Sequence, residues 1–401
     1  MPAAAPEATD FSVLKGVAHA ALAVSGGSDS LALMRLAGDW AARHHPVLML
    51  SVLTVDHRLR RESTAEARQV GRWAAAFGLS HHILAWADEP KPGTGLQAAA
   101  RAARYGLMAA WCRANGADLL LTGHSLDDQA ETVAMRLART SSPDSLSGIR
   151  PLGDWQGLPI GRPLLDLRRQ ALRCYLEGIG QPWIDDPSNE DTRFERVRVR
   201  RALAAAEQAG TAPDWLAGLA AANAVEAAGM AQDAEAWLGR WLEEHPAGFC
   251  VVPAAAFREL PENLQQRVLG RITSHYGGEG PRPEPEELRR LARWACGGDG
   301  ASRRTLGGAV FGRRKPGFWV TREPGRITVS PGIVPETGKL LWDKRFLIEA
   351  APGSAILPSR ARRPDLGTGV PVFAREAYPS VEARAATQVP PRVTFCSLVR
   401  R

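Results

Sequence analysis

The sequence predicts an α/β fold with a parallel sheet covered by helices on both faces, followed by a helical linker and smaller α+β units. Two observations lead to this prediction. Short apolar runs alternate with helical patterns over the first half of the chain, which is typical of βαβ units. The 401 residues are 45% hydrophobic, which is enough for two or three domains with separate cores.

In order along the chain, strands are expected at 18–24, 47–55, 81–86 and 118–122. Helical patterns at 62–77 and 95–115 separate them, with the apolar spacing of amphipathic helices. Parallel strands of this kind bind ligands beyond their carboxyl ends. The polar segments that follow each strand are therefore the places to look for chemistry.

The second half changes in character after about residue 202, where the chain becomes alanine-rich and helical. Further helices are expected at 260–276 and 284–296, and an apparent hairpin at 305–323. The predicted domains are 1–205 (catalytic), 206–245 (helical linker) and 246–330 (second unit). Residues 331–401 hold many Pro and Arg residues and predict a small third unit or a partly ordered tail.

Composition restricts the possible classes of protein. The chain has no run of about 18 apolar residues and no signal-peptide pattern at its start, so we expect a cytoplasmic protein without a membrane partner. Its five cysteines form no CxxC pair, which argues against a zinc site or a disulfide framework. A net charge of +7 fits a polyanionic partner. Charge alone does not decide whether that partner is a nucleic acid.

The segment "ALAVSGGSDS" (21–30) follows the first expected strand and opens a helix. Glycines allow backbone N–H groups to converge on a phosphate, and a helix N-terminus adds partial positive charge. The alternative is a simple turn with an N-cap. The segment lacks the lysine of a Walker A loop and the GxGxxG pattern of a dinucleotide fold. The expected nucleotide-binding residues are Ser25, Gly26, Gly27, Ser28, Asp29 and Ser30, of which Asp29 suits Mg²⁺.

The pattern SGGxDS at the end of a strand resembles the PP-loop ATP pyrophosphatases, which cleave ATP between the α and β phosphates. The resemblance implies a Rossmann-like sheet of the adenine nucleotide alpha hydrolase type and a loop that holds the leaving pyrophosphate. Five further segments narrow it: "VDHRLR" (55–60), "RAARY" (101–105), "GHSLDDQAET" (123–132), "RPLL" (162–165) and "WIDDPSNEDTRFERVRVRR" (183–201). Together they resemble the tRNA(Ile)-lysidine synthases over residues 18–202. The hairpin also resembles that family's first C-terminal domain, and the last 70 residues a shortened second one.

Three acids in "GHSLDDQAET" are spaced for adjoining faces of one helical turn: Asp127, Asp128 and Glu131. They could simply complement the helix dipole. Beside a nucleotide site they suit Mg²⁺ or a cationic amino acid better than phosphate. The resemblance implies that free L-lysine binds around this segment, and it leaves open which of Asp29, Asp127 and Asp128 holds the metal.

Two histidines and two arginines follow expected strands or face the expected cleft. His124, and less strongly His57, is either a core or capping residue or a contact for phosphate or nucleobase. Arg101 and Arg104 are three apart on one helix, where surface ion pairs are the ordinary role. By resemblance, Arg101 is expected to stabilise charge on the α phosphate during transfer.

The density of arginines at 193–201 predicts an anionic partner, because like charges three and four apart on a helix repel. The backbone of tRNA and ATP phosphate are the candidates. The residues are Arg193, Arg196, Arg198, Arg200 and Arg201.

The resemblance implies an ATP- and Mg²⁺-dependent ligase that adenylates the wobble cytidine of a tRNA(Ile) with a CAU anticodon and then joins L-lysine to C2. Asp29, Arg101, His124 and Asp127 are the expected catalytic residues. A homodimer stays open. A tRNA thiolase would share the loop but generally needs paired cysteines or an iron–sulfur cluster. A non-catalytic RNA-binding scaffold is the second alternative, and it predicts losses in the loop or the acids that the sequence does not show.

Overall fold

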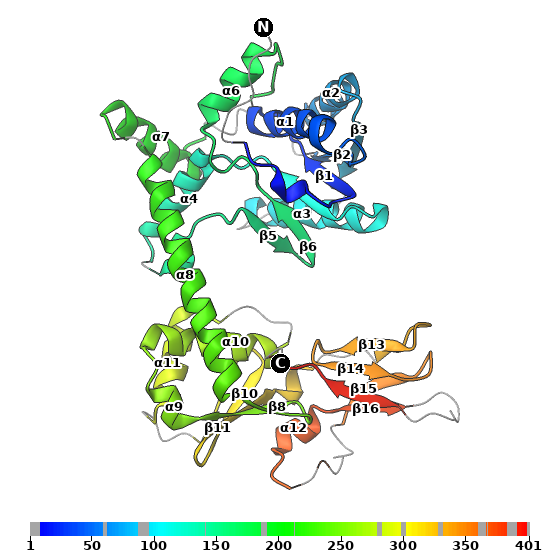
Figure 1. Cartoon of the computed structure of the whole chain (residues 1–401), viewed down its shortest axis with the longest axis vertical. Helices are drawn as coiled ribbons and strands as arrows, with labels where there is room; N and C mark the ends of the chain where they lie inside the picture. Colours follow the sequence, from blue (N-terminus) through cyan, green and yellow to red (C-terminus); the bar gives the residue numbers. More distant parts are fainter. Residues whose placement is uncertain are drawn as a thin grey trace. The chain divides into compact units, whose positions relative to one another are not determined.

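The computed structural model describes residues 9–58, 62–86, 96–140, 142–185, 191–211, 213–278, 283–297, 302–327, 332–359, 366, 368–382 and 391–398. The chain divides into two compact units, Met1–Ala227 and Ala228–Arg401, each with its own sheets (Figure 1). Within these described ranges, no helix is both long and apolar enough to cross a membrane.

The first unit is built on a six-stranded sheet in the order β3-β2-β1-β4-β6-β5. The strands are β1 (His19–Ala23), β2 (Met49–Asp56), β3 (Ser80–Ala85), β4 (Leu119–Thr122), β5 (Leu152–Trp155) and β6 (Leu158–Gly161). Every neighbouring pair is parallel except β5 with β6. The mostly parallel sheet confirms the predicted fold class, and the four predicted strands are β1 to β4.

Successive residues of β1 serve opposite faces of the sheet, as the pleat of a strand requires. Leu22 packs into a core with the leucines of α1 (Ser28–His44), whereas Ala21 joins a second core with Met108 of α3 (Leu96–Asn115). Both faces are therefore covered by helices (Figure 1). The remaining helices of this part are η1 (Ser12–Leu14), α2 (Ser63–Ala76), α4 (Leu126–Leu137), α5 (Pro143–Leu146), α6 (Arg169–Gly178) and α7 (Glu195–Gln208).

The long helix α8 (Asp214–Trp241) contributes to both units. Its first turns pack Leu216 and Ala220 on α4, while Trp237 and Leu238 near its end belong to the core of the second unit. The predicted linker 206–245 contains the end of α7, all of α8 and also β7 (Glu243–His245), which pairs in the sheet of the second unit. The four domain boundaries themselves stay predictions.

The second unit begins with a five-stranded antiparallel sheet in the order β7-β8-β11-β10-β9. Its elements are β7 (Glu243–His245), β8 (Phe249–Pro253), α9 (Ala254–Arg258), α10 (Glu262–Tyr276), α11 (Pro285–Ala295), β9 (Arg303–Leu306), β10 (Ala309–Arg314) and β11 (Gly317–Arg322). The two predicted helices are α10 and α11. The predicted hairpin is β10 with β11, and β9 adds a third antiparallel strand to it.

The described residues after 323 form two small three-stranded sheets, β12-β15-β16 and β13-β14-β17. Trp342, Phe346, Ile348 and Ile356 fill a core of their own. The elements are η3 (Pro324–Arg326), β12 (Gly332–Ile333), β13 (Lys339–Trp342), β14 (Phe346–Glu349), β15 (Ala355–Pro358), α12 (Val372–Glu376), β16 (Pro379–Glu382) and β17 (Arg392–Phe395).

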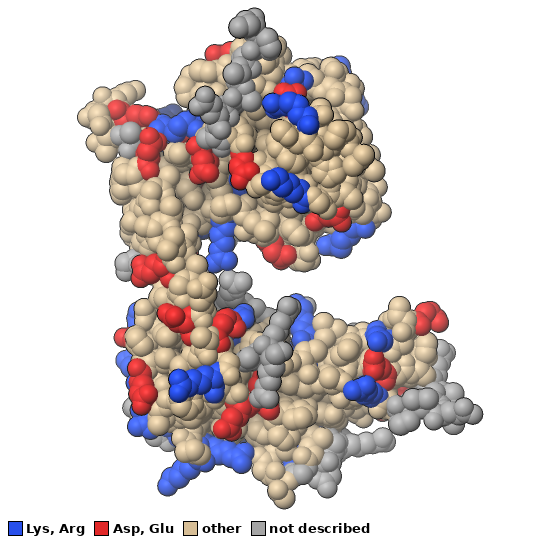
Figure 2. All heavy atoms as spheres, in the orientation of Figure 1, with Lys and Arg blue, Asp and Glu red and all other residues tan. Residues whose placement is uncertain are grey.

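On the face drawn in Figure 2, basic and acidic side chains are interspersed among uncharged ones. The net charge of +7 is therefore not gathered into one patch of that face. Sites for anions have to be found from the contacts of individual side chains.

Candidate functional site

The loop after β1 is folded tightly against the start of α1. Gly26 has a φ of +94°, and a Cβ there would lie 2.9 Å from the side chain of Ile184, so only glycine fits. Gly27 is the N-cap of α1, and the Ser30 hydroxyl donates to its carbonyl oxygen at 2.9 Å. Ser30 therefore holds the loop closed, whereas the exposed Ser25 lies at its surface.

A second close approach places this loop beside the next strand end. A Cβ at Gly123 would lie 2.7 Å from the carbonyl oxygen of Asp29, so the chain leaving β4 passes directly against the first turn of α1. The hydroxyl of Ser125 then reaches both Asp29, at 3.3 Å, and Asp128, at 3.2 Å. The starts of α1 and α4 are thus joined through two carboxylates and one hydroxyl.

Arginines from two other helices neutralise these acids, and we call the set the paired cluster: Asp29, Asp127, Asp128, Glu131, Arg168, Arg169, Arg196 and Arg200. Arg169 lies at its centre. Its guanidinium contacts Asp29 at 2.9 Å, Asp128 at 3.2 Å and Glu131 at 3.5 Å. Its backbone N–H also donates to Asp127 at 2.6 Å. One residue at the start of α6 therefore touches all four acids.

Glu131 is the most buried of the four, with 2% of its side chain exposed. Besides Arg169, it accepts from Arg196 at 2.7 Å and from Arg200 at 2.6 Å, both on α7. A buried carboxylate requires such partners. The density of arginines predicted an external anion for Arg196 and Arg200, and Glu131 is an internal one.

Asp127 is the acid with the loosest ion pair. Arg168 approaches it at 3.5 Å but lies closer to Glu207 and Asp214, each at 2.7 Å. Asp127 also keeps 22% of its side chain exposed. Among the four acids, it is the most accessible to an incoming cation.

The charges of the cluster shift one another's titration. Burial raises the pKa of Asp29, against the opposing effect of Arg169. Burial also acts to raise the pKa of Asp128, but Arg169 and Arg196 outweigh it, so that pKa is lowered. Asp29 and Asp128 are hard oxygen donors beside the loop, and this chemistry fits Mg²⁺ that retains several waters. Within the described ranges, no three His, Cys, Asp or Glu side chains form a metal-binding group by themselves.

A second group of arginines lies at the same edge of the sheet, and we call Arg101, Arg104 and Arg162 the unpaired cluster. The first two lie over the ring of Tyr105, with guanidinium carbons 5.1 Å and 5.4 Å from its centre. Arg162 follows β6 and donates to the carbonyl of Arg150 at 2.7 Å. In the part of the chain that the structure describes, none of the three has a carboxylate partner.

His124 lies between the two clusters. Burial lowers its pKa to about 4, with Asp128 acting in the opposite direction and Arg162, Arg101 and Arg104 in the same one. Its Nδ1 lies 2.9 Å from the hydroxyl of Thr122. His124 is therefore neutral at pH 7, and it can exchange hydrogen bonds without adding charge.

The other predicted arginines have local partners. Arg193 pairs with Asp191 at 2.6 Å, and Arg198 donates to the carbonyls of Thr192 and Arg193. Arg201 lies exposed in α7. These side chains secure the start of α7 or its surface, and the structure does not bring Arg193 or Arg198 into either cluster.

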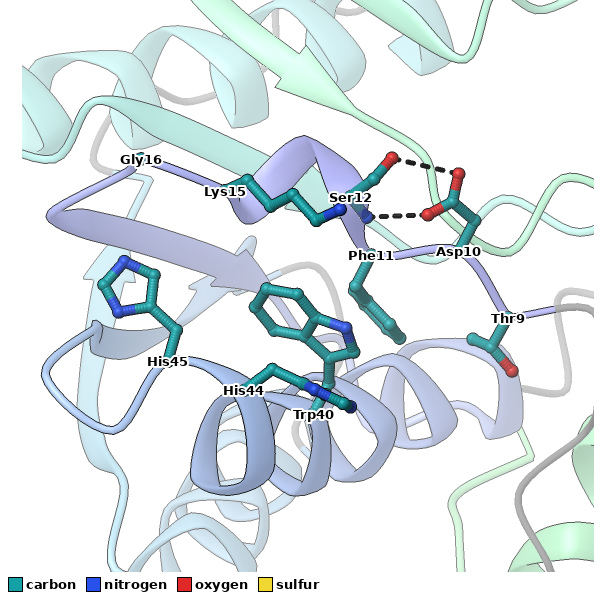
Figure 3. Close-up of a pocket in the computed structure, with 9 residues that line it drawn as sticks. All are labelled: Thr9, Asp10, Phe11, Ser12, Lys15, Gly16, Trp40, His44 and His45. Carbon is teal, nitrogen blue, oxygen red and sulfur yellow. Dashed lines mark hydrogen bonds between the residues drawn. The ribbon is translucent and has the colours of Figure 1, made fainter.

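Two hollows of the structure lie elsewhere. One, of about 610 Å³, is lined by Thr9, Asp10, Phe11, Ser12, Lys15, Gly16, Trp40, His44 and His45 (Figure 3). Trp40 and His44 belong to the last turns of α1, which spans 17 residues and so roughly 25 Å from the loop. Another, of about 600 Å³, lies at the starts of β2 and β3. Neither coincides with the two clusters, so polar geometry defines the candidate site.

Comparison with known proteins agrees with this geometry. The family model described as a PP-loop domain matches residues 5–207. The tRNA(Ile)-lysidine synthase of Brucella anthropi is 38% identical over 81% of this chain and 72% of the relative. Those of Methylobacterium nodulans and Hyphomonas neptunium are 42% and 37% identical, over 76% and 88% of this chain and 90% and 92% of theirs.

Proposed function

The chain belongs to the tRNA(Ile)-lysidine synthase family of PP-loop proteins, and from this premise we propose how its residues join L-lysine to a tRNA. It is an ATP-dependent, tRNA-modifying ligase whose RNA substrate is tRNA(Ile). The observation that carries the proposal is the meeting of three features at one sheet edge: the loop at the start of α1, the paired cluster and the unpaired cluster.

The first step is adenylation of the wobble cytidine of the CAU anticodon. The C2 carbonyl oxygen attacks the α phosphorus of ATP, an O–P bond forms, and the bond to the bridging oxygen of pyrophosphate breaks. The N–H groups around Gly26 and Gly27 and the hydroxyls of Ser25 and Ser28 hold the departing pyrophosphate. Arg101, which has no acid partner among the described residues, offsets the charge that grows on the α phosphate.

Mg²⁺ would be held by Asp29, with Asp128 next to it, and would offset phosphate charge when bound. Asp29 is suited to this because burial raises its pKa, so that a cation beside it stabilises the ionised form. Neutral His124 contributes a hydrogen bond to phosphate or base.

The second step is attack of the lysine ε-amino group on C2, which forms the C–N bond and releases AMP with the former carbonyl oxygen. We assign the ammonium group of lysine to Asp127, Asp128 and Glu131. Because arginines already pair with these acids, lysine must share or displace a guanidinium. Asp127 is the easiest place to begin, since its ion pair is long and its side chain partly exposed. The amine must lose a proton before it attacks.

The second unit is proposed to bind tRNA. Arginines of the first unit are proposed to contact tRNA or phosphate: Arg104, Arg193, Arg196, Arg198, Arg200 and Arg201. The candidate backbone contacts of the second unit are Arg303, Arg304, Arg313, Arg314 and Lys315 on the β9-β10-β11 meander. Arg313 and Arg314 already donate to backbone carbonyls, of Trp294 and Gly369. The domain division predicted above and a homodimer stay proposals, which limited proteolysis and light scattering would test.

Incubation of the purified protein with ATP, Mg²⁺, radiolabelled L-lysine and a tRNA(Ile) transcript tests the proposal. We expect label in the tRNA, dependent on ATP, and none in a transcript whose wobble cytidine is replaced by uridine. Sulfur incorporation, or binding of the transcript without any label transfer, would overturn the lysine assignment.

A further inference from the structure

Three buried polar atoms without hydrogen-bond partners lie at or beside Tyr105, and a fourth belongs to His57, a neighbour of Arg104. They are the hydroxyl of Tyr105, Nε1 of Trp155, Nε of Arg162 and Nδ1 of His57, none of which has a partner in the described part of the chain. Tyr105 itself is only 3% exposed. Buried polar groups without partners are uncommon in folded proteins, and each indicates a missing ligand or a specific function. Three of these four atoms carry a hydrogen that they can donate.

The same place holds half-buried positive charge without an acid partner among the described residues. The guanidiniums of Arg104 and Arg162 lie near the Tyr105 hydroxyl, and burial lowers the pKa of both. No carboxylate from the described residues pairs with either, in contrast to Arg169 a short distance along the same sheet edge. Two half-buried guanidiniums without a carboxylate partner among the described residues favour an anion beside them.

The elements around Tyr105 hold these groups firmly. The β5-β6 hairpin turns at Gln156 and Gly157, both with positive φ, and this places Trp155 against Tyr105 with ring centres 5.1 Å apart. The hairpin also fixes Arg162, because a Cβ at Gly153 would lie 2.9 Å from its Nη1. The donors thus come from α3 and from both ends of one hairpin, a rigid arrangement suited to a small anion.

We propose that Tyr105, Arg104, Arg162 and the indole N–H of Trp155 form a phosphate-binding site. The choice between its two sources, a phosphate of ATP and a phosphodiester of the tRNA backbone, rests on the proposed function. The proposal gives Tyr105, Trp155 and Arg162 a role in binding. It also names the residues with which Arg104 would bind phosphate. Phosphate supplies acceptor oxygens for the buried donors and negative charge that balances the guanidiniums.

The test measures the dissociation constants of Mg·ATP and of a tRNA(Ile) transcript separately, on the full chain. Three variants probe the site: Tyr105→Phe keeps the ring and its stack, Arg162→Gln removes charge, and Gly153→Ala displaces the end of Arg162. We expect each variant to weaken the binding of one of the two ligands. Loss of a charged hydrogen bond should raise the dissociation constant by about tenfold. Arg113→Gln, which removes an exposed charge from the same helix, is the matched control.

The two sources give different results. If tRNA occupies the site, transcript binding weakens, ATP binding is unchanged, and the salt dependence of Arg162→Gln falls by roughly 0.7 to 0.9 in log–log slope. If ATP occupies it, only ATP binding weakens. Should all three variants bind both ligands as tightly as the unchanged protein, while circular dichroism shows them folded, the phosphate site is wrong. Lysine incorporation by the unchanged protein is measured apart from these constants, so failure of the proposed function is distinguishable.

Discussion

The paired and unpaired clusters use the same residue type at the same sheet edge for opposite purposes. In the paired cluster, Arg169, Arg196 and Arg200 converge on Glu131, a carboxylate that is almost fully buried. In the unpaired cluster, Arg101, Arg104 and Arg162 surround Tyr105 without an acid among the described residues. The acids of the first arrangement are already neutralised within the chain, whereas the arginines of the second have no such partner among the described residues. We therefore expect loss of the buried Glu131 charge to affect stability, and changes in the second cluster to affect binding with little effect on stability.

The largest expected effect is that of Asp29→Ala, at the point where the paired cluster meets the loop before α1. Asp29→Ala should lower the rate of pyrophosphate release by about 10³-fold, since the proposed metal ligand is lost. The protein should stay folded, because Asp29 is a buried acid whose raised pKa shows that its charge is unfavourable there. A coupled pyrophosphate assay and circular dichroism measure the two quantities. Asp233→Ala, an exposed acid on α8, is the control, and activity that survives Asp29→Ala rules out the metal role.

A change at Glu131, the most buried acid of the paired cluster, should lower the stability of the fold in addition to any effect on lysine binding. Glu131→Gln removes the charge shared by three arginines and should lower the free energy of unfolding by about 3–5 kcal/mol. Urea denaturation of this variant and of Glu195→Gln measures the difference. Glu195 pairs with Arg139 at the surface, where loss of a pair costs roughly 0–1 kcal/mol. Equal losses in the two variants would contradict the structural role of Glu131.

His124, which lies between the two clusters, should make the stability of the protein depend on pH. The pKa of His124 is about 4 in the folded protein against 6.5 in the unfolded chain, so the unfolded chain binds more protons between these values. Stability contributed by His124 is complete above pH 6.5 and is lost as the pH falls toward 4. Over this pH window, the free energy of unfolding of His124→Gln should therefore fall by up to about 3 kcal/mol less than that of the unchanged protein. Identical pH profiles in urea titrations, with His44→Gln as the control, would mean that His124 is not held neutral.

The smallest expected effect is that of Arg162→Gln in the unpaired cluster, the counterpart of Glu131→Gln in the paired cluster. Arg162→Gln removes one hydrogen bond to a backbone carbonyl and relieves repulsion between guanidiniums, so the free energy of unfolding should change by less than about 1 kcal/mol. Urea denaturation checks this. A loss as large as that of Glu131→Gln would show that Arg162 has a buried acid partner and would end the distinction between the clusters.

The sequence predicted the first four strands because each contains a short apolar run followed by polar residues. Three of them, β1, β2 and β4, are largely buried, as parallel strands covered on both faces are. The remaining strand, β3, lies at the edge of the sheet and is partly exposed. The sequence did not predict β5 and β6, which are four residues each and are interrupted by Gly153, Asp154 and Pro159. That hairpin carries Trp155 and leads to Arg162, so half of the phosphate site proposed here was missed with it.

The pairing of acids with arginines could not be predicted from spacing. Arg169 lies 140 residues from Asp29, and Arg196 lies 65 from Glu131. Only the packing of α6 and α7 against the starts of α1 and α4 brings them together. The sequence indicated the acids by their local spacing on one helical turn, and it indicated Arg162 only as part of "RPLL", without a role.

The most direct test of the account is mass analysis of the anticodon fragment of a tRNA(Ile) transcript after reaction with ATP and Mg²⁺, with and without L-lysine. With lysine, we predict that one cytidine gains the mass of one lysine residue. Without lysine, the same cytidine should carry an AMP adduct, because adenylation precedes amine attack. An unmodified cytidine in both reactions, or a fragment that gains sulfur, would contradict the account.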